Sequence, residues 1–372
     1  ASANAGDGAD FILYGPSLLV RNSVFSGNID NPDLSAWGFG IYTYTYPLNA
    51  PAAITLDNVI LNGNDADGAY LVTGGNIMLN KVYAANNLQH GVYISGSYTS
   101  NSVGAKNVTV TNSTFTSNQD NNLEIHASGA VKITNLYSTS SGGDGLYVNN
   151  HSYNTLLAPV TVLGAVLSGN NLNGVSIASD GTITVAGITA NGNGGFGMYL
   201  DNWWTGSAGN IIISASLGLN QLNENTGGNG LYAGSFRNIS ISSVQANRNT
   251  YYGIYIGGYG ATSNVTLLNV EASGNKGTGA EDAGISITAK GSVLLNKVTA
   301  GYNAGNGIYI KNEAGTYSRP VTISNSSANY NGYTGATDNN KKGIYVLSAG
   351  QITLSGVTAS GNSHTGTYLE NT

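Results

Sequence analysis

The sequence predicts an all-β fold built from stacked coils, and three observations support this. A short phrase, seen most clearly at Asn306-Gly307-Ile308-Tyr309-Ile310, recurs along the whole chain. From residue 68 onward, every second interval between copies is 23 residues, and the other intervals are longer and variable. No segment shows helical periodicity. A fixed period of this length is typical of solenoids, in which each repeat packs only on its neighbours.

Each repeat supplies three short strands. In the recurring phrase, Ile308 and Ile310 point to one side and Tyr309 to the other, because side chains alternate along a strand. A second strand follows a turn, as at Ile352-Thr353-Leu354, and a third extended piece resembles Val298-Thr299-Ala300. This arrangement describes one coil of a parallel β-helix. We expect about 13–14 coils, with short coils of 23 residues alternating with longer ones.

A column of asparagines marks one corner of the coil. Each lies four residues before the glycine that opens the next strand in most repeats, where a tight corner favours a residue that tolerates the left-handed conformation. Stacked about 4.8 Å apart, such side chains can also bond to the next coil. The predicted structural column consists of Asn64, Asn87, Asn118, Asn170, Asn193, Asn249, Asn303 and Asn362.

The motifs Gly-Ile-x-Ile and Asn-x-x-x-Gly, as at Asn303 to Ile310, give the chain a family resemblance. It resembles the right-handed parallel β-helix repeats of the pectate-lyase-like superfamily, over nearly its whole length. The resemblance implies right-handed coils. That fold carries lyases, hydrolases, epimerases, phage tailspikes and inert surface proteins, so it does not determine activity. We expect a non-enzymatic surface or filament type.

The length would allow two or three domains, but the continuous repeat indicates one elongated domain, residues 1–372, without a linker. Charged residues make up 9% of the chain, against roughly 25% in typical globular domains, which suits a secreted or cell-surface protein. The net charge is -6, and the sequence contains no stripe of basic residues, so we expect no nucleic-acid partner. There is no cysteine, which excludes disulfides and thiol catalysis, and no apolar run long enough to span a membrane.

The familiar catalytic signatures of β-helix enzymes are absent from the sequence, and one polar constellation is present. Stacking the coils places Asp67, His90, Asn121 and Asp144 in one column, with Glu124 and His126 on the strand after Asn121. Two carboxylates beside a histidine are suited to acid–base chemistry. Solvated polar corners explain the same residues without any reaction, and this interpretation is favoured. We expect no catalytic residues, metal or cofactor; Asp65 with Asp67, and Glu281-Asp282, have too few ligands for a dedicated calcium site.

A tyrosine column is the most informative side-chain feature. By alternation these residues point outward, and such a stripe serves either glycan platforms or protein interfaces. Tyrosine also pairs favourably with itself across strands, which explains part of the column. The candidate binding or interface residues are Tyr42, Tyr70, Tyr93, Tyr147, Tyr199, Tyr232, Tyr255, Tyr309, Tyr345 and Tyr368, with Trp203 and Trp204 on a loop.

The two ends of the sequence resemble half-coils. Ala1–Asn4 matches the end of a coil, and 365–372 matches the beginning of one, with no capping element at either end. Two explanations stay open: a segment of a longer solenoid, or copies that continue each other end to end. We therefore expect an extracellular structural solenoid, a building block of a surface filament, sheath or adhesin that is assembled head-to-tail, with lateral contacts through its exposed aromatic residues. The alternative is a polysaccharide-binding or polysaccharide-degrading β-helix.

Overall fold

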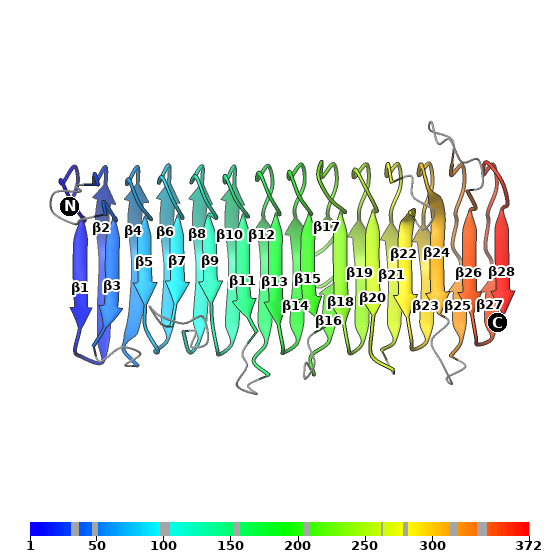
Figure 1. Cartoon of the computed structure of the whole chain (residues 1–372), viewed down its shortest axis with the longest axis horizontal. Helices are drawn as coiled ribbons and strands as arrows, with labels where there is room; N and C mark the ends of the chain where they lie inside the picture. Colours follow the sequence, from blue (N-terminus) through cyan, green and yellow to red (C-terminus); the bar gives the residue numbers. More distant parts are fainter. Residues whose placement is uncertain are drawn as a thin grey trace. The chain divides into compact units, whose positions relative to one another are not determined.

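The computed structural model describes residues 1–30, 37–46, 51–96, 105–151, 157–203, 208–261, 263–277, 282–312, 319–332 and 341–371. The regular elements of these residues are β-strands, and the pairs between them are parallel (Figure 1). The chain divides into two compact units, Ala1–Gly181 and Thr182–Thr372, which are described separately. The expectation of a single domain over 1–372 stays a prediction.

Unit 1 consists of two parallel sheets, which we call the tyrosine sheet and the bent sheet. The tyrosine sheet has the order β1 (Ala9–Leu13), β3 (Ile41–Thr45), β5 (Ala69–Val72), β7 (Val92–Ser95), β9 (Leu123–His126), β11 (Leu146–Asn150) and β13 (Val175–Ser179). The bent sheet has the order β2 (Ser17–Ser26), β4 (Ala53–Asn62), β6 (Ile77–Ala85), β8 (Val108–Thr116), β10 (Val131–Thr139) and β12 (Val160–Val166).

Unit 2 repeats the same plan. Its tyrosine sheet has the order β15 (Met198–Asn202), β18 (Leu231–Ser235), β20 (Ile254–Gly258), β22 (Ala283–Ala289), β24 (Asn306–Asn312), β26 (Ile344–Ser348) and β28 (Thr367–Asn371). Its bent sheet has the order β14 (Ile183–Thr189), β16 (Ile211–Ser214), β19 (Ile239–Gln245), β21 (Val265–Glu271), β23 (Val293–Thr299), β25 (Val321–Ser324) and β27 (Ile352–Ser355). The short strand β17 (Asn220–Gln221) pairs with β14 and β19.

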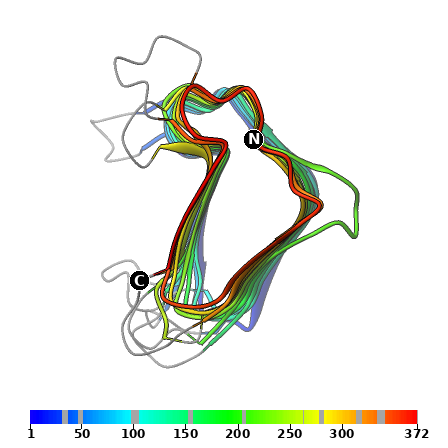
Figure 2. The same cartoon turned by 90° about the vertical axis from the view of Figure 1, so that its right-hand side faces the viewer.

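The bent sheet joins two of the three predicted strands. In β6, Lys81 has a φ of +53°, and its left-handed backbone turns the strand without ending it. Asn58, Asn135 and Asn269 occupy the equivalent place in other coils, with φ between 53° and 56°. Figure 2 views the coils end-on, and the bent sheet there has two straight halves that meet at a corner. The second and third extended pieces of each coil are therefore continuous in most strands.

Aliphatic side chains of both sheets fill the interior of each unit. Val148, Leu200, Ile256, Ile308 and Ile310 are all fully buried, which confirms the predicted register of the tyrosine sheet. Identical side chains stack on consecutive coils, since Ile308 pairs with Ile285 and with Ile344. A one-residue shift would turn all these side chains outward, so burial of this row fixes the register.

Exposure of Tyr309 was predicted wrongly. Tyr147 and Tyr255 are partly exposed on the outer face, but Tyr309 is only 4% exposed. Its register is as expected, because it pairs with Tyr345 and points away from its buried neighbours. Its burial comes from packing on the outer face, where the ring of Tyr345 lies 5.2 Å away at an interplanar angle of 74°. Alternation predicts the direction of a side chain but not what covers it.

Candidate functional site

Asparagine side chains form a hydrogen-bonded ladder before the strands of the tyrosine sheet. The Oδ1 atom of Asn87 accepts bonds from the backbone N (3.1 Å) and Nδ2 (2.8 Å) of Asn64, and Asn118 does the same for Asn87. Asn170 instead accepts a bond from the backbone N of Ser141 at 3.1 Å. In unit 2 the ladder consists of Asn193, Asn225, Asn249, Asn275, Asn303, Asn331 and Asn362.

The ladder includes residues that the sequence analysis missed. Asn28, Asn225, Asn275 and Asn331 bond in the same way, but each is followed by its strand glycine after more than four residues. The insertions lie between the asparagine and the glycine, so a fixed spacing could not find them. The ladder holds the turn residues that follow it, including the polar residues of the candidate site.

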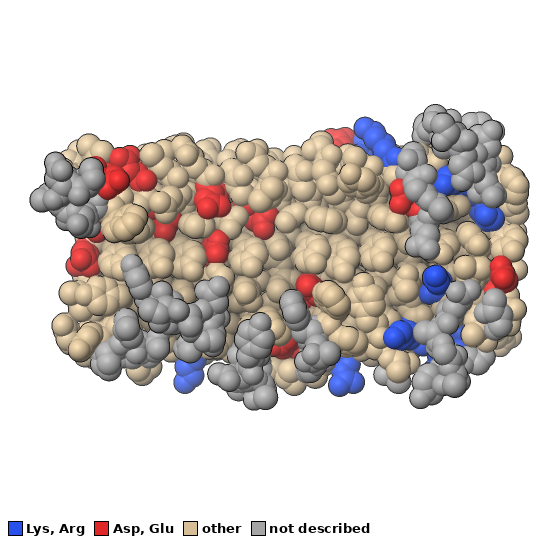
Figure 3. All heavy atoms as spheres, in the orientation of Figure 1, with Lys and Arg blue, Asp and Glu red and all other residues tan. Residues whose placement is uncertain are grey.

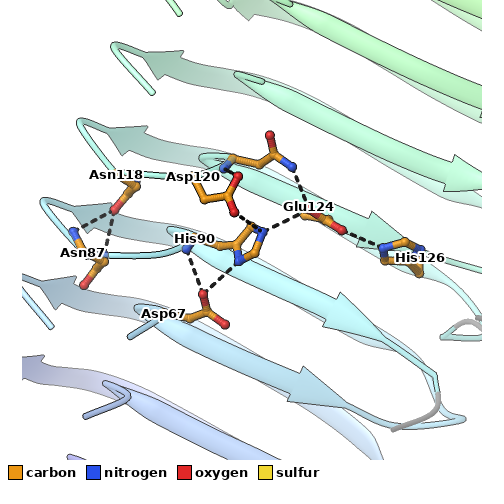
Figure 4. Close-up of polar contacts among 8 residues, drawn as sticks. Asp67, Asn87, His90, Asn118, Asp120, Glu124 and His126 are labelled. Atoms are coloured by element: carbon orange, nitrogen blue, oxygen red, sulfur yellow. Dashed lines mark hydrogen bonds and ion pairs between the residues drawn. The ribbon is translucent and has the colours of Figure 1, made fainter. Parts of the chain in front are cut away.

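His90 is the centre of a charged cluster on the outer face of the tyrosine sheet in unit 1 (Figure 4). Its Nδ1 lies 2.9 Å from Oδ1 of Asp67, which also accepts the backbone N–H of His90 at 2.7 Å. Its Nε2 lies 3.1 Å from Oε2 of Glu124 and 3.5 Å from Oδ2 of Asp120. The turns before β5 and β7 and the strand β9 thus bring Asp67, His90 and Glu124 together, as the column predicted.

Glu124 connects this cluster to His126. Its Oε1 lies 2.7 Å from Nε2 of His126, and its Oε2 accepts a bond from Nδ2 of Asn121 at 2.6 Å. Nδ1 of His126 is buried and has no hydrogen-bond partner in the described part of the chain. The rings of Tyr93 and Tyr147 lie on either side of this imidazole, at 5.5 and 5.9 Å.

His90 and Glu124 hold opposite charges at neutral pH. Burial alone lowers the pKa of His90, but the hydrogen bonds and charges of Asp67 and Glu124 outweigh it and raise the pKa to about 10. Burial raises the pKa of Glu124, but hydrogen bonds from His126 and His90 and the charge of His90 lower it well below its usual range. Because an acid–base catalyst needs a pKa near the working pH, this pair is suited to holding charge rather than exchanging protons.

Asp144, the other acid of the predicted column, is not among the residues that contact His90 in this cluster. Its backbone N–H donates to Oδ1 of Asn121 at 2.6 Å, and its Oδ1 accepts the backbone N–H of Asn173 at 2.7 Å. Burial raises its pKa to about 6, against the hydrogen bonds from Asn173, and the negative charges of Glu124 and Asp120 add to the rise. Asp144 therefore titrates closer to neutral pH than an ordinary aspartate.

The described residues contain no group of three or more His, Asp or Glu side chains arranged to hold a metal ion. Glu281 lies outside the described residues, so the pair Glu281-Asp282 is not part of that statement.

The tyrosine column forms stacks whose ring faces contact each other. In unit 1, Tyr70 and Tyr93 lie 4.8 Å apart with an interplanar angle of 7°, and Tyr42 stacks on Tyr70 at 5.6 Å. Such rings present their edges and hydroxyl groups outward. A glycan platform uses a free ring face, so the stacked geometry favours a structural role for these residues.

Unit 2 has two further groups of the column. Tyr232 lies between Tyr199 at 4.6 Å and Tyr255 at 5.6 Å, with interplanar angles of 8° and 7°. Tyr345 makes edge contacts with Tyr309 and with Tyr368. The predicted loop residue Trp203 is 44% exposed and lies 5.7 Å from the ring of Tyr259, whereas Trp204 lies outside the described residues.

Comparison with known families identifies the repeat. Residues 215–372 match the family described as the right-handed beta helix region. The parallel coils described above extend the same repeat to residues before the match. This chain is a parallel β-helix repeat protein. No curated protein matches the sequence of this β-helix.

The described part of this β-helix contains no helix with the length and apolarity needed to cross a membrane. Figure 3 shows that uncharged residues form most of one face of the protein.

Sequence analysis missed an apolar row on the outer face of the bent sheet in unit 1. Val24, Ile60, Tyr83 and Tyr137 are 47%, 41%, 39% and 48% exposed. Val24, Ile60 and Tyr83 are in register on three consecutive coils, and Tyr137 continues the row one coil beyond Thr114. We call these residues the apolar row. The signal was present in the third extended piece of each repeat, whose middle residue points outward.

Proposed function

We propose that this β-helix is a non-catalytic structural protein of the cell exterior, which associates laterally with copies of itself. The observation that carries this proposal is the apolar row of unit 1. Contiguous exposed apolar side chains on a soluble protein are typical of interaction sites. The tyrosine column, expected to provide these contacts, has most of its ring faces covered by its own neighbours.

The geometry of the apolar row suits a second copy of the chain. Its side chains come from parallel strands in register, so the row is straight and repeats at the spacing of the coils. Two identical rows can face each other about a two-fold axis, in which each patch is its own complement. The charges of Arg21 and Asp57 on this sheet are paired with each other, with Arg21 Nε 2.9 Å from Asp57 Oδ2.

The polar cluster supports a structural role more than a catalytic one. His90 and Glu124 hold opposite charges across the neutral range, and each has its partners within the protein. The cluster therefore stabilises the stacking of β5, β7 and β9. The low charge content supports a location outside the cell, in a filament, sheath or adhesin. End-to-end stacking of copies stays a prediction, which electron microscopy of the native protein tests.

Sedimentation velocity over a concentration series tests lateral association. We expect the wild-type protein to self-associate, and the double variant Ile60→Glu/Tyr83→Glu to weaken association at least about tenfold, because two charges would be buried in the contact. The matched control is Leu88→Glu, which changes an equally exposed apolar residue of unit 1 outside the row. A monomeric wild type at all concentrations contradicts the proposal, as does an equal effect of Leu88→Glu.

A depolymerisation assay against a panel of neutral and acidic polysaccharides tests the absence of catalysis. We expect no product above the level of a heat-denatured control. Product formed by the wild type and lost in Glu124→Gln would replace the structural proposal with an enzymatic one.

A further inference from the structure

A hollow of about 300 Å³ lies on the outer face of unit 2, where β21 and β23 of the bent sheet end and beside the segment that follows β25. Its volume is at the lower end of the range for small-molecule sites, about 300–1,000 Å³, and matches one ring-sized group. The residues that line it are Glu271, Ser273, Thr299, Gly301, Tyr302, Ser327, Asn329 and Tyr330.

The hollow exists because one coil lacks a side chain. Gly301 occupies the place that Ser273 has in the preceding coil and Asn329 has in the following one. A Cβ atom at Gly301 would have only the carbonyl oxygen of Asn329, at 3.2 Å, and the hydroxyl of Ser273, at 3.9 Å, within 4 Å. The backbone at Gly301 therefore forms the floor of the hollow, between the side chains of Ser273 and Asn329.

Two tyrosines form one wall. Tyr302 and Tyr330 both have a φ of +57°, at the left-handed corner of the coil that Glu224, Arg248 and Gly274 occupy in other coils of unit 2. The conformation is therefore shared by the coils, and what distinguishes this place is that two neighbouring coils both carry a tyrosine there. The rings are stacked 5.1 Å apart with an interplanar angle of 13° and are 65% and 47% exposed. Two exposed, stacked aromatic rings therefore line this side of the hollow.

The residues at the equivalent position in the neighbouring coils leave one face of the Tyr302 ring open. The ring of Tyr330 lies between Tyr302 and Gly361, since a Cβ on Gly361 would come within 2.6 Å of that ring. On the other side of Tyr302, the equivalent residue is Gly274, which has no side chain to cover the ring. A free ring face differs from the closed stacks of the tyrosine column, and it can pack against the C–H face of a sugar ring.

The opposite wall carries hydrogen-bonding groups in fixed positions. The carboxylate of Glu271 accepts bonds from Nε2 of Gln245 at 3.2 Å and Nδ2 of Asn247 at 2.9 Å. Ser327 Oγ donates to Thr299 Oγ1 at 3.4 Å. A carboxylate and two hydroxyls facing an aromatic wall suit a ligand rich in hydroxyl groups. The charge of Glu271 disfavours a ligand that carries its own carboxylate.

We infer that this hollow binds a neutral sugar residue of a glycan chain. An apolar side chain of a protein partner fits less well, because the wall opposite the tyrosines is polar. A second hollow of about 180 Å³ shares Glu271 and Thr299 and continues toward Gln245 and Lys297. Two adjoining hollows along the coils provide places for consecutive sugars of one chain.

Isothermal titration of the full chain with cellohexaose, laminarihexaose and mannohexaose tests this inference, with hexagalacturonate as the acidic comparison. We expect at least one neutral hexamer to bind, and Tyr302→Gly to weaken that binding at least about tenfold through loss of the stacking face. Because glycine suits a φ of +57°, Tyr302→Gly is expected to keep or raise the thermal midpoint. Loss of binding in that variant cannot then come from unfolding.

Two further variants make the test specific. Glu271→Gln is expected to weaken binding about three- to tenfold, because a neutral amide replaces the charged acceptor. Tyr251→Ala, at a tyrosine of unit 2 that is 51% exposed and outside the hollow, is expected to leave affinity unchanged. The inference is overturned if no neutral hexamer binds, if hexagalacturonate binds as tightly, or if Tyr302→Gly binds like wild type. A change in the sedimentation coefficient of Tyr302→Gly would assign the hollow to a protein contact instead.

Discussion

Asn303 shows how much one side chain contributes at a corner of the coil. It is 1% exposed, accepts bonds from the backbone N and Nδ2 of Asn275, and donates to the carbonyl of Ala272 and to Oδ1 of Asn331. The side chain therefore joins three coils. Its loss leaves buried donors and acceptors without partners, and such groups are costly in a protein interior.

Asn303→Ala is therefore expected to lower the free energy of unfolding by about 2–3 kcal/mol. Urea denaturation followed by circular dichroism measures the change. Asn107→Ala is the control, since Asn107 is exposed and its bonds to Asn76 and Ala130 lie at the surface. Equal losses in both variants would show that the ladder adds no stability beyond a surface asparagine.

His90 makes the stability of the protein depend on pH. Its folded pKa of about 10 exceeds the ordinary value of 6.5, so the stabilisation is fully present below pH 6.5 and is lost as the pH rises through about 10. Loss of the buried charge pair is expected to cost about 2–4 kcal/mol over this window. Urea unfolding at pH 6.5 and pH 10 measures it. In His90→Gln this difference between the two pH values should shrink markedly, and an unchanged difference would mean that another group titrates there.

At the scale of elements, contacts between side chains on neighbouring strands stabilise the tyrosine sheet. Tyr232 stacks on a ring above and a ring below. Tyr147 has Glu124 and Ser176 as its neighbours in register, and its one ring contact among the described residues is the tilted imidazole of His126 at 5.9 Å. Tyr232→Ala is expected to cost about 2–3 kcal/mol, and Tyr147→Ala about 1 kcal/mol less, because aromatic pairs add about 0.5–1.5 kcal/mol each. Thermal unfolding measures both. A larger loss for Tyr147→Ala would show that stacking does not stabilise the column.

Some features of the elements followed from the sequence, and others did not. The alternation around Tyr147 and Ile308 predicts which side chains are inside, because a strand has a period of two. It does not predict that Tyr309 is covered, since coverage depends on the outer face. A spacing of four finds Asn303 but misses Asn331, whose coil carries an insertion before Gly343.

At the scale of the whole molecule, the repeat predicts the fold more fully than the site. The 23-residue interval indicates parallel coils, and the pairing of Asp67, His90 and Glu124 follows from stacking them. The charge state of that cluster depends on distances and burial, which a sequence does not contain. The apolar row and the hollow at Tyr302 arise from outward residues of the bent sheet, whose turn at a left-handed residue the sequence did not reveal.

Hydroxyl-radical footprinting over a concentration series tests the central claim most directly, because it reports the solvent exposure of individual side chains. Met78, Tyr83 and Tyr137 are all exposed on the bent sheet of unit 1 and are readily oxidised. Lateral association through the apolar row predicts that labelling of Tyr83 and Tyr137 falls as concentration rises, while labelling of Tyr147 on the tyrosine sheet stays constant. Protection of Tyr147 with unchanged labelling of Tyr83 and Tyr137 would contradict the account.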